Sequence, residues 1–187
     1  MNKRLSDILI SIVAIIILAV PFLIIALIVK LSSKGPVIYW SRRFGQNENF
    51  FMMPKFRTMK INTPEISTDK LTIPENYLTP TGPFLRRTSL DEIPQFFSVL
   101  IGDMSVVGPR PVLHNENEVI TRRNKLGINK LKPGITGWAQ VNGRDNVTLD
   151  EKVKFDHEYL LKQNLMFDIL IIAKTLKIVV YAKDITH

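Results

Sequence analysis

The chain has 187 residues, which is enough for one domain with a hydrophobic core and little more. It contains no cysteine, so disulfides and thiolate metal sites are excluded. Residues 1–60 carry +7 of the formal net charge of +8, from nine Lys or Arg against Asp7 and Glu48. Nucleic-acid binders usually spread their basic residues over the folded domain, so this clustering instead indicates anionic lipid headgroups and phosphorylated ligands as partners.

The first predicted element is a long hydrophobic helix. The 22 residues from Ile8 to Val29 carry no charge. As a straight helix they would be about 33 Å long, which is enough to cross the hydrocarbon core of a bilayer. The run is longer than the apolar part of a usual signal peptide, and no clear small-residue cleavage site follows it.

Two features of this helix favour a re-entrant path over a spanning one. Pro21 removes a backbone hydrogen bond inside the run and bends the helix. Lys and Arg flank both ends, so the positive-inside bias draws both ends towards the cytoplasm. A helix that breaks at Pro21, enters one leaflet and returns satisfies both features. A spanning helix with a tolerated proline is the alternative.

The middle of the chain predicts two short strands, a loop and a helix. Alternating apolar residues favour strands within 36–40 and 49–61, and the proline-rich stretch 61–83 is typical of an ordered loop over a site. A helix then follows, with Gly102 as its stop. Its apolar residues recur at helical spacing and form one face: Ile93, Phe96, Phe97, Leu100 and Ile101.

The last third predicts helices separated by turns. A polar helix is indicated within 112–131, glycine-punctuated turns within 132–144, a helix over 150–163 and an apolar helix over 167–182. The last helix is short for spanning, and it either lies at the membrane interface or is buried in the core. The fold class is therefore α+β, mostly helical with a small β element and amphipathic interface helices.

The most informative stretch contains two adjacent carboxylates, Asp91 and Glu92. Pro94 is comfortable only in the first turn of a helix, so the helix is predicted to start near this pair. Ser89 and Glu92 also have the spacing of a capping box. An ionised Asp at this position can attack phosphorus and form an acyl phosphate. Acidic residues are also common in first helical turns, so position alone does not decide between the two roles.

Basic residues near the pair favour phosphate chemistry. Arg86 precedes it, and Arg110 stands between two prolines that restrict the backbone and present its side chain. Guanidinium groups suit bidentate capture of a diphosphate. Lys55 and Arg57 lie two apart on a predicted strand and so share one face. There is no glycine-rich loop followed by Lys-Ser/Thr, and the three His have no metal-ligand spacing.

With these motifs the chain resembles the small monotopic phosphoglycosyl transferases, the bacterial sugar transferases that start glycoprotein, capsule and O-antigen assembly. The match covers nearly the whole chain in order. It rests on four stretches: KFRTM at 55–59, RRTSLDEIPQ at 86–95, GDMSVVGPRP at 102–111 and PGITGWAQVNGR at 133–144.

The resemblance implies that a UDP-sugar and undecaprenyl phosphate give undecaprenyl-diphosphate-sugar and UMP. Asp91 would be the nucleophile, forming a covalent phosphosugar intermediate in a ping-pong cycle and helping to hold Mg²⁺. Glu92 would position or deprotonate the polyprenyl phosphate. Further site positions are implied for the substrate: Lys55, Arg57, Arg86, Arg110, Arg144 and Asp168. For Asp168 a plain acid at a helix N-terminus is the alternative.

The resemblance also implies a setting. Residues 1–30 would form the re-entrant membrane helix, and residues 31–187 a catalytic domain at the cytoplasmic face of the bacterial inner membrane. Membrane lipid would be a partner and nucleic acid would not. The family usually has Ser before the membrane proline, whereas this chain has Val20, so the break would rest more on Pro21 and on packing.

Two other functions compete with the enzyme: an inactive membrane-anchored scaffold of a glycan assembly complex, and a lipid-surface or nucleic-acid binding module. The intact acidic pair and basic residues disfavour the scaffold, and the binding module predicts salt-sensitive binding without turnover. For the sugar we expect an N-acetylated hexosamine derivative first and a hexose such as galactose second. The sequence gives no oligomeric state.

Overall fold

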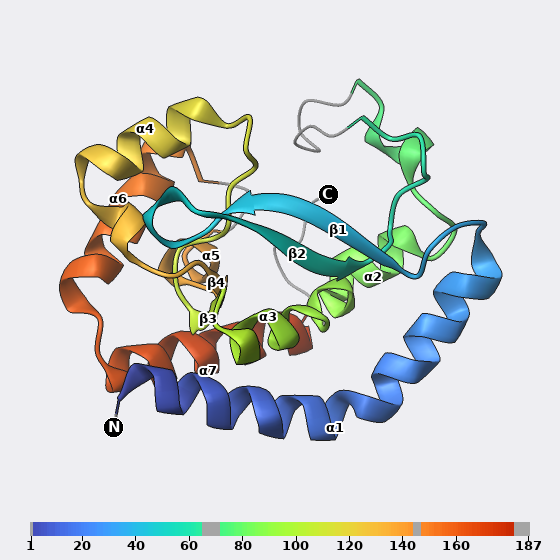
Figure 1. The fold of residues 1–187 in the computed structure, drawn as a ribbon, viewed down its shortest axis with the longest axis horizontal. Helices are drawn as coiled ribbons and strands as arrows, with labels where there is room; N and C mark the ends of the chain where they lie inside the picture. The colour runs from blue at the N-terminus through green and yellow to red at the C-terminus, as the bar shows by residue number, and fades with distance from the viewer. Residues whose placement is uncertain (1, 65–71, 144–146, 182–187) are drawn as a thin grey trace.

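The computed structural model describes residues 2–64, 72–143 and 147–181, which form a mostly helical α+β fold with two small sheets (Figure 1). This confirms the predicted fold class. The helices and strands are, in chain order, α1 (Lys3–Ser32), β1 (Ile38–Phe44), β2 (Phe50–Phe56), α2 (Gly82–Thr88), α3 (Gln95–Ile101), β3 (Ser105–Val107), α4 (Asn117–Lys125), β4 (Gly134–Thr136), α5 (Trp138–Val141), α6 (Leu149–Lys162) and α7 (Leu165–Tyr181). Short 3₁₀ turns lie between them: η1 (Gln46–Glu48), η3 (Pro74–Tyr77), η4 (Leu90–Glu92) and η5 (Ile128–Lys130).

The apolar N-terminal segment is a single helix, α1, with Pro21 inside it. In Figure 1 it runs beneath the rest of the molecule and then bends upwards towards β1. The ring of Phe22 lies 4.9 Å from that of Phe56 and 6.1 Å from that of Phe97, so packing against β2 and α3 holds the helix beside the proline. Val20 is 66% exposed and takes no part in this packing. The membrane topology of α1 remains a prediction.

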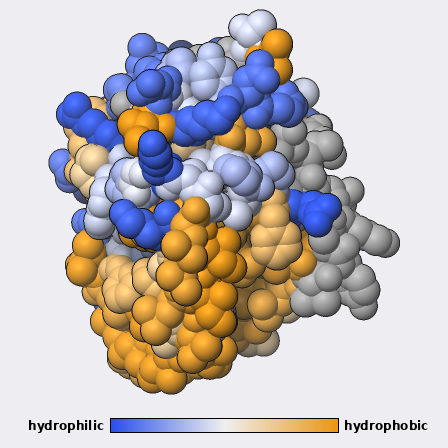
Figure 2. Space-filling model, turned by 90° about the vertical axis from the view of Figure 1, so that its right-hand side faces the viewer, coloured by the Kyte–Doolittle hydropathy of each residue, from blue (hydrophilic) through white to orange (hydrophobic). Residues whose placement is uncertain are grey.

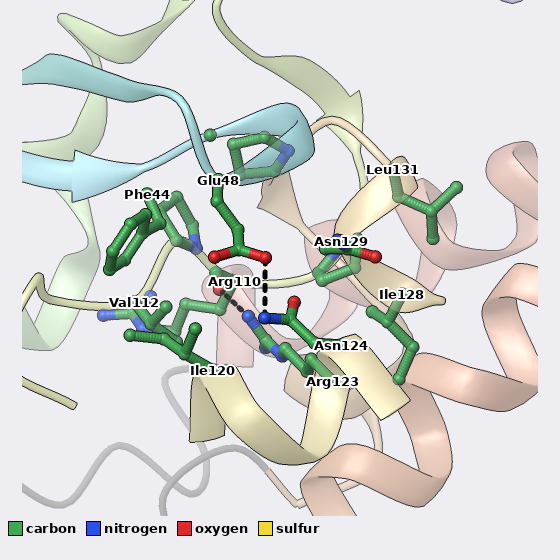
Figure 3. Close-up of a pocket in the computed structure, with 14 residues that line it drawn as sticks. Phe44, Glu48, Arg110, Val112, Ile120, Arg123, Asn124, Ile128, Asn129 and Leu131 are labelled. Carbon is green, nitrogen blue, oxygen red and sulfur yellow. Dashed lines mark hydrogen bonds between the residues drawn. The ribbon is translucent and has the colours of Figure 1, made fainter. Parts of the chain in front are cut away.

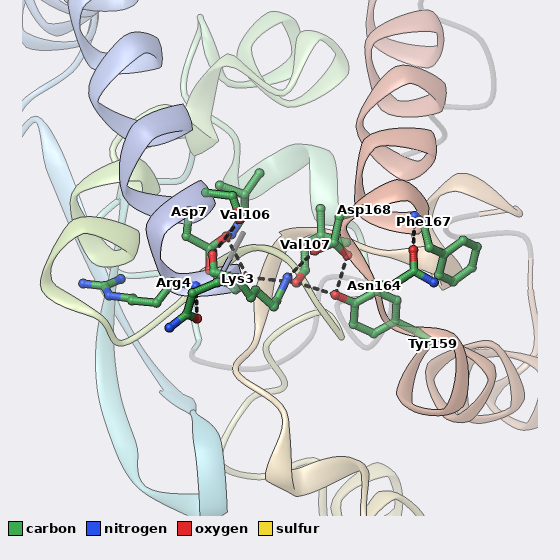
Figure 4. A network of polar contacts seen from close by, with 12 residues as sticks. Lys3, Arg4, Asp7, Val106, Val107, Tyr159, Asn164, Phe167 and Asp168 are labelled. Carbon is green, nitrogen blue, oxygen red and sulfur yellow. Dashed lines mark hydrogen bonds and ion pairs between the residues drawn. The ribbon is translucent and has the colours of Figure 1, made fainter.

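Polar contacts join the first turns of α1 to three other elements, and Figure 4 shows those with β3 and α7. The Arg4 guanidinium donates to the backbone carbonyls of Val99 and Leu100 at the end of α3, at 2.5 and 2.6 Å. The Asp7 carboxylate accepts from the backbone N–H of Val106 in β3 at 2.9 Å. Lys3 forms an ion pair of 2.7 Å with a carboxylate of α7. The helix is therefore docked on the rest of the fold through its N-terminal end.

The two predicted strands are confirmed as an antiparallel hairpin of β1 and β2, with Tyr39 paired to Lys55 and Arg43 to Phe51. The parallel pairing of β3 with β4 was not predicted, because each strand has only three residues and β4 lies in a glycine-rich stretch. In this second sheet Ser105 pairs with Gly134 and Val107 with Thr136.

Two apolar clusters form the core, one around β2, β3, α3, α6 and α7, the other where α1 meets the hairpin and α2. The predicted apolar face of α3 is only partly in this core, since Phe97 and Ile101 are 47% and 75% exposed. The buried positions of α3 are instead Gln95, Ser98 and Val99. The helix is turned so that its apolar face joins the exposed apolar surface of the molecule.

That exposed surface gathers on one side. Figure 2 shows a hydrophobic lower part and a largely hydrophilic upper part. Large exposed apolar side chains come from α1, including Ile16 and Leu31, and from α7, including Met166 and Leu176. In the described part of the chain, α1 is the one helix that is long and apolar enough to cross a membrane. The predicted helices over 150–163 and 167–182 are confirmed as α6 and α7, and α7 buries Ile171 while exposing its other side.

Candidate active site

Asp91 and Glu92 lie in the tight turn η4 between α2 and α3. Ser89, just before the turn, has a left-handed backbone with φ of 57°, which ends α2 and reverses the chain. The predicted capping box does not form, because Ser89 provides no side-chain cap to η4. The helix after the pair also starts later than predicted, at Gln95, with Pro94 as its N-cap residue. The carboxylates therefore project from a turn between helices.

The pair is bound by two cations from distant parts of the chain. The Lys55 ammonium, at the end of β2, lies 2.8 Å from Oε1 of Glu92 and 4.0 Å from Oδ2 of Asp91. The Arg110 guanidinium lies 3.4 Å from the same Glu92 oxygen. Four of the predicted site residues are thus linked by ion pairs, although up to 55 positions separate them (55 to 110).

Burial sets the protonation behaviour of Asp91, which is only 7% exposed. Burial raises the pKa of its carboxyl from 3.8 to about 6; the nearby Lys55 ammonium opposes that rise and Glu92 adds to it. The charges of Arg86 and Arg110 also lower this pKa, which puts Arg86, half-buried in the last turn of α2, within electrostatic reach of Asp91. The carboxyl is therefore mostly ionised at neutral pH and gains a proton just below it.

A cavity with about 210 Å³ of space, part of it open to solvent, lies beside Glu92. Its walls include Lys55, Glu92, Gln95 and Arg110, and also Arg43, which the sequence reasoning missed. Burial, and secondly the Arg110 charge, lower the pKa of Arg43 to about 10. Two guanidinium groups in one cavity repel each other, and a phosphate anion between them would relieve that repulsion. Strand alternation could have indicated Arg43. Tyr39 pairs with Lys55 across the hairpin, and Arg43, four residues after Tyr39, lies on the same face of β1.

Close backbone packing fixes the loop that carries Arg110. The N–H of Gly108 donates to Thr136 O at 2.9 Å, and the N–H of Gly134 donates to Pro109 O at 2.9 Å. A Cβ on Gly134 would collide with the backbone nitrogen of Gly108, so this approach needs glycine. Arg123 also donates to the Arg110 carbonyl at 2.9 Å. The stretch 133–137 thus serves as a support for the loop with Arg110.

A second, larger cavity with about 400 Å³ of empty space adjoins the first and shares Arg110 and Pro111 with it (Figure 3). Apolar side chains form much of its wall: Phe44, Val112, Ile120, Ile128 and Leu131. At its edge Asn124 donates to the carboxylate of Glu48 at 2.7 Å. The two cavities therefore meet at Arg110 and Pro111.

Two predicted site residues have other partners. All three guanidinium nitrogens of Arg57, which is 4% exposed, donate to the carbonyls of Ser33, Lys34 and Pro36, at 2.6 to 2.9 Å. These bonds hold the segment that links α1 to β1. Arg57 lines neither of the two cavities.

Asp168 lies in the first turn of α7, where its carboxylate is 2.7 Å from the Lys3 ammonium and 2.7 Å from the Tyr159 hydroxyl (Figure 4). None of these three residues lines either cavity. Arg144, another predicted site residue, lies outside the described residues.

The acidic pair suits Mg²⁺ only as a partial ligand set. In the described ranges no group of three or more His, Cys, Asp or Glu could hold a metal ion. Mg²⁺ is usually bound through one or two carboxylates together with substrate phosphates and water, so a full protein cage is not required. The Lys55 ammonium already forms an ion pair with one Glu92 oxygen at 2.8 Å, so Asp91 is the better ligand for Mg²⁺.

A family model described as bacterial sugar transferase matches residues 1–182. The chain belongs to the bacterial sugar transferase family. This bacterial sugar transferase is 42% identical over 180 residues to the UDP-glucose:undecaprenyl-phosphate glucose-1-phosphate transferase of Escherichia coli (strain K12), in an alignment that covers 92% of this chain and 39% of that relative. The chain therefore spans well under half the length of that protein. The resemblance drawn from the motifs is confirmed.

Two further relatives of this bacterial sugar transferase differ in how much of them is covered. The exopolysaccharide production protein ExoY of Sinorhizobium fredii (strain NBRC 101917 / NGR234) is 36% identical over 191 residues, which cover 94% of this chain and 84% of the relative. The galactosyl transferase CpsE of Streptococcus agalactiae serotype III (strain NEM316) is 40% identical over 157 residues, which cover 78% of this chain and 35% of the relative.

Proposed function

We propose that this bacterial sugar transferase moves a sugar 1-phosphate from a UDP-sugar to undecaprenyl phosphate and releases UMP, as the first membrane step of glycoconjugate assembly. The name of the E. coli relative supports this donor and this acceptor, and that of ExoY supports an exopolysaccharide product. One observation carries the proposal: the buried Asp91 lies beside Glu92, with Lys55 and Arg110 on the same pair. Carboxylate and cations together are what covalent phosphoryl transfer requires.

The reaction proceeds by two displacements at one phosphorus atom. First, a carboxylate oxygen of Asp91 attacks the phosphorus that carries the sugar, and the bond from this phosphorus to the bridging oxygen breaks, so that UMP leaves. The product is an acyl phosphate on Asp91. An oxygen of undecaprenyl phosphate then attacks the same phosphorus, and Asp91 leaves as a free carboxylate. Because UMP leaves before the acceptor reacts, the kinetics are ping-pong.

The neighbouring residues stabilise charge and hold one another in position. Lys55 and Arg110 offset the negative charge that develops on the phosphate oxygens. Glu92, at 2.8 and 3.4 Å from these two cations, fixes them beside Asp91 and positions or deprotonates the acceptor phosphate. Asp91 would hold Mg²⁺ together with substrate phosphate oxygens, and the ion, when bound, supplies further charge neutralisation there.

We assign the enzyme to the cytoplasmic face of the bacterial inner membrane, with residues 1–30 as a re-entrant membrane segment and residues 31–187 as the catalytic domain. Support comes from the exposed apolar surface of α1 and from the Lys and Arg that flank both of its ends. For the sugar, the names of the relatives favour a hexose such as glucose or galactose over an N-acetylated hexosamine.

The proposal is tested by UMP release from a panel of UDP-sugars, with the purified chain, undecaprenyl phosphate and Mg²⁺. We expect Asp91→Asn to lower the rate roughly 10³-fold or more. Glu75→Gln, which neutralises an exposed carboxylate, is the control and keeps full activity. Without acceptor, UDP-glucose labelled at the phosphate next to the sugar should label the wild-type protein but not Asp91→Asn.

Each failure has a defined meaning. Full activity of Asp91→Asn would refute this residue as the nucleophile. A wild-type chain that turns over no UDP-sugar would instead favour the inactive membrane-anchored scaffold.

A further inference from the structure

Gln95, the first residue of α3, is buried, has an unused hydrogen-bond donor and lines the cavity beside Glu92, which we call the reaction cavity. Its side chain is 2% exposed. Among the residues that the structure describes, none accepts a hydrogen bond from its buried amide nitrogen Nε2. The same side chain lines the cavity of about 210 Å³, with Lys55, Glu92 and Arg110.

A buried donor without a partner needs an explanation. Nearly all buried polar groups in folded proteins are hydrogen-bonded, because desolvation without a new bond destabilises the fold. An apolar side chain of similar size, such as Met, would fill the position of Gln95 without that penalty. The buried amide therefore destabilises the ligand-free protein, and a ligand in the cavity would supply the missing hydrogen-bond acceptor.

The cavity indicates which acceptor this is. Its cationic wall, formed by Arg43, Lys55 and Arg110, selects for an anion. Oxygen atoms of a phosphate accept hydrogen bonds from neutral amides as well as from cations. A neutral donor can thus orient a phosphoryl oxygen without adding a fourth positive charge to a site whose two guanidinium groups already repel each other.

We propose that Nε2 of Gln95 donates a hydrogen bond to a non-bridging oxygen of the phosphoryl group that is transferred. This inference rests on the proposed function. The bond aligns the phosphorus with the Asp91 carboxylate and strengthens as charge builds up on the oxygen in the transition state. Gln95 is thereby a catalytic residue that shares the phosphate with Lys55 and Arg110.

The decisive variant is Gln95→Met, which keeps the volume and removes the donor. We expect kcat for UMP release to fall roughly 10²-fold, as for loss of one donor to a developing oxyanion, with KM for the UDP-sugar changed much less. The melting temperature of the solubilised protein should stay equal or rise, because an unpaired buried donor is gone. Gln163→Met, at an exposed position after α6, is the matched control and should change neither quantity.

The first half-reaction shows whether Gln95 contacts the transferred phosphate or the phosphate of the acceptor. With UDP-glucose and no acceptor, wild type should release one equivalent of UMP in a burst, and Gln95→Met should slow that burst. If the burst is unchanged and only turnover with undecaprenyl phosphate slows, the assignment to the transferred phosphate is overturned in favour of the acceptor's phosphate.

Two other outcomes overturn the inference outright. One is full activity of Gln95→Met, and the other is a parallel fall of activity and melting temperature, which would show a purely structural role. Failure of the proposed function looks different, since wild type itself would then release no UMP. Gln95→Glu provides a second variant: it keeps the shape, loses the Nε2 donor and adds a negative charge, so its loss of kcat should exceed that of Gln95→Met.

Discussion

The proposed reaction needs an ionised Asp91 in a place that disfavours charge, and Lys55 is the group that most offsets the effect of burial on its pKa. A carboxyl whose pKa is raised on folding, here from 3.8 to about 6, takes up protons more readily in the folded state than in the unfolded state. Its contribution to stability is complete below the unfolded pKa and is lost as the pH rises through the folded pKa. The ionised carboxyl therefore destabilises the folded protein at neutral pH, a cost that the proposed role of Asp91 as nucleophile would explain.

This cost predicts a pH-dependent effect of Asp91→Asn on stability. In EDTA, the variant should melt several degrees above wild type at pH 7.5, and the difference should shrink towards pH 5 as the wild-type carboxyl is protonated. The measurement is the melting temperature of both proteins from pH 5 to 8, with Glu75→Gln as the exposed control. A difference that does not vary with pH would contradict the raised pKa.

Arg57 shows how a correct motif can suggest the wrong partner for a side chain. The strand pattern placed Lys55 and Arg57 on one face, which suggested that both serve the phosphate. Strand β2 ends at Phe56, however, and the Arg57 guanidinium donates to the carbonyls that follow α1. The sequence could not reveal this, because the acceptors are backbone atoms more than twenty positions away.

Arg57→Met should therefore act on the fold. We expect a loss of about 3 kcal/mol or more in stability, because three buried carbonyls lose hydrogen bonds from a charged donor. The rate of UMP release per folded molecule should stay within about threefold of wild type, as expected for a residue outside the reaction cavity. Melting curves and active-site titration by the UMP burst measure the two quantities. A fall in rate with unchanged melting temperature would return Arg57 to the phosphate site.

At the scale of elements, the sequence predicted most of what has a repeating pattern. The long apolar helix, the two strands of the hairpin, α6 and α7 were predicted from apolar runs or from the spacing of apolar residues, whereas the pairing of the two strands was not predicted. The β3–β4 pair and the turn η4 were missed because they are short and depend on contacts with distant backbone. The motifs predicted the acidic pair and Arg110 as site residues, and the structure brings them together, whereas the packing of β4 against the Arg110 loop became visible only in three dimensions.

Gly134→Ala tests that packing. The added methyl group would meet the backbone of Gly108 and displace the loop that carries Arg110. We expect a destabilisation of roughly 2 kcal/mol and a loss of activity of roughly 10²-fold, because Arg110 leaves its place beside Glu92. The control is Gly127→Ala: Gly127 has a positive φ of 72° but no atom near its missing Cβ, so this change should cost only about 1 kcal/mol and leave kcat intact. Similar effects of both changes on kcat would contradict the role of β4 as a support.

At the scale of the whole molecule, the polar and apolar sides have different surroundings. The apolar side is formed largely by α1, α3 and α7. Much of the reaction cavity is lined from β1, β2 and β4, and these strands lie above α1 in Figure 1. The phosphate of the proposed acceptor would lie at the depth where a bilayer meets water, which is where such a division of the surface would hold the protein.

The path of α1 can be decided by labelling, since the chain contains no cysteine of its own. Single cysteines at Asn2→Cys and Lys34→Cys, at the two ends of the helix, should both react with a membrane-impermeant thiol reagent from the same side of oriented vesicles. That result would fit a re-entrant helix, because both ends would then face one aqueous compartment. Reaction from opposite sides would mean that α1 spans the membrane.

The polar contacts of Lys3, Arg4 and Asp7 also bear on how this enzyme can be handled. A hydrophobic anchor that merely tethers a domain can be cut away to leave a water-soluble catalytic fragment. Here, removing α1 would remove the polar partners of the end of α3, of β3 and of Asp168 in α7. It would also expose the apolar cluster around Leu85 and Ile93 to solvent. Preparations for biochemistry or crystallisation should therefore keep the helix and provide detergent or nanodiscs for it.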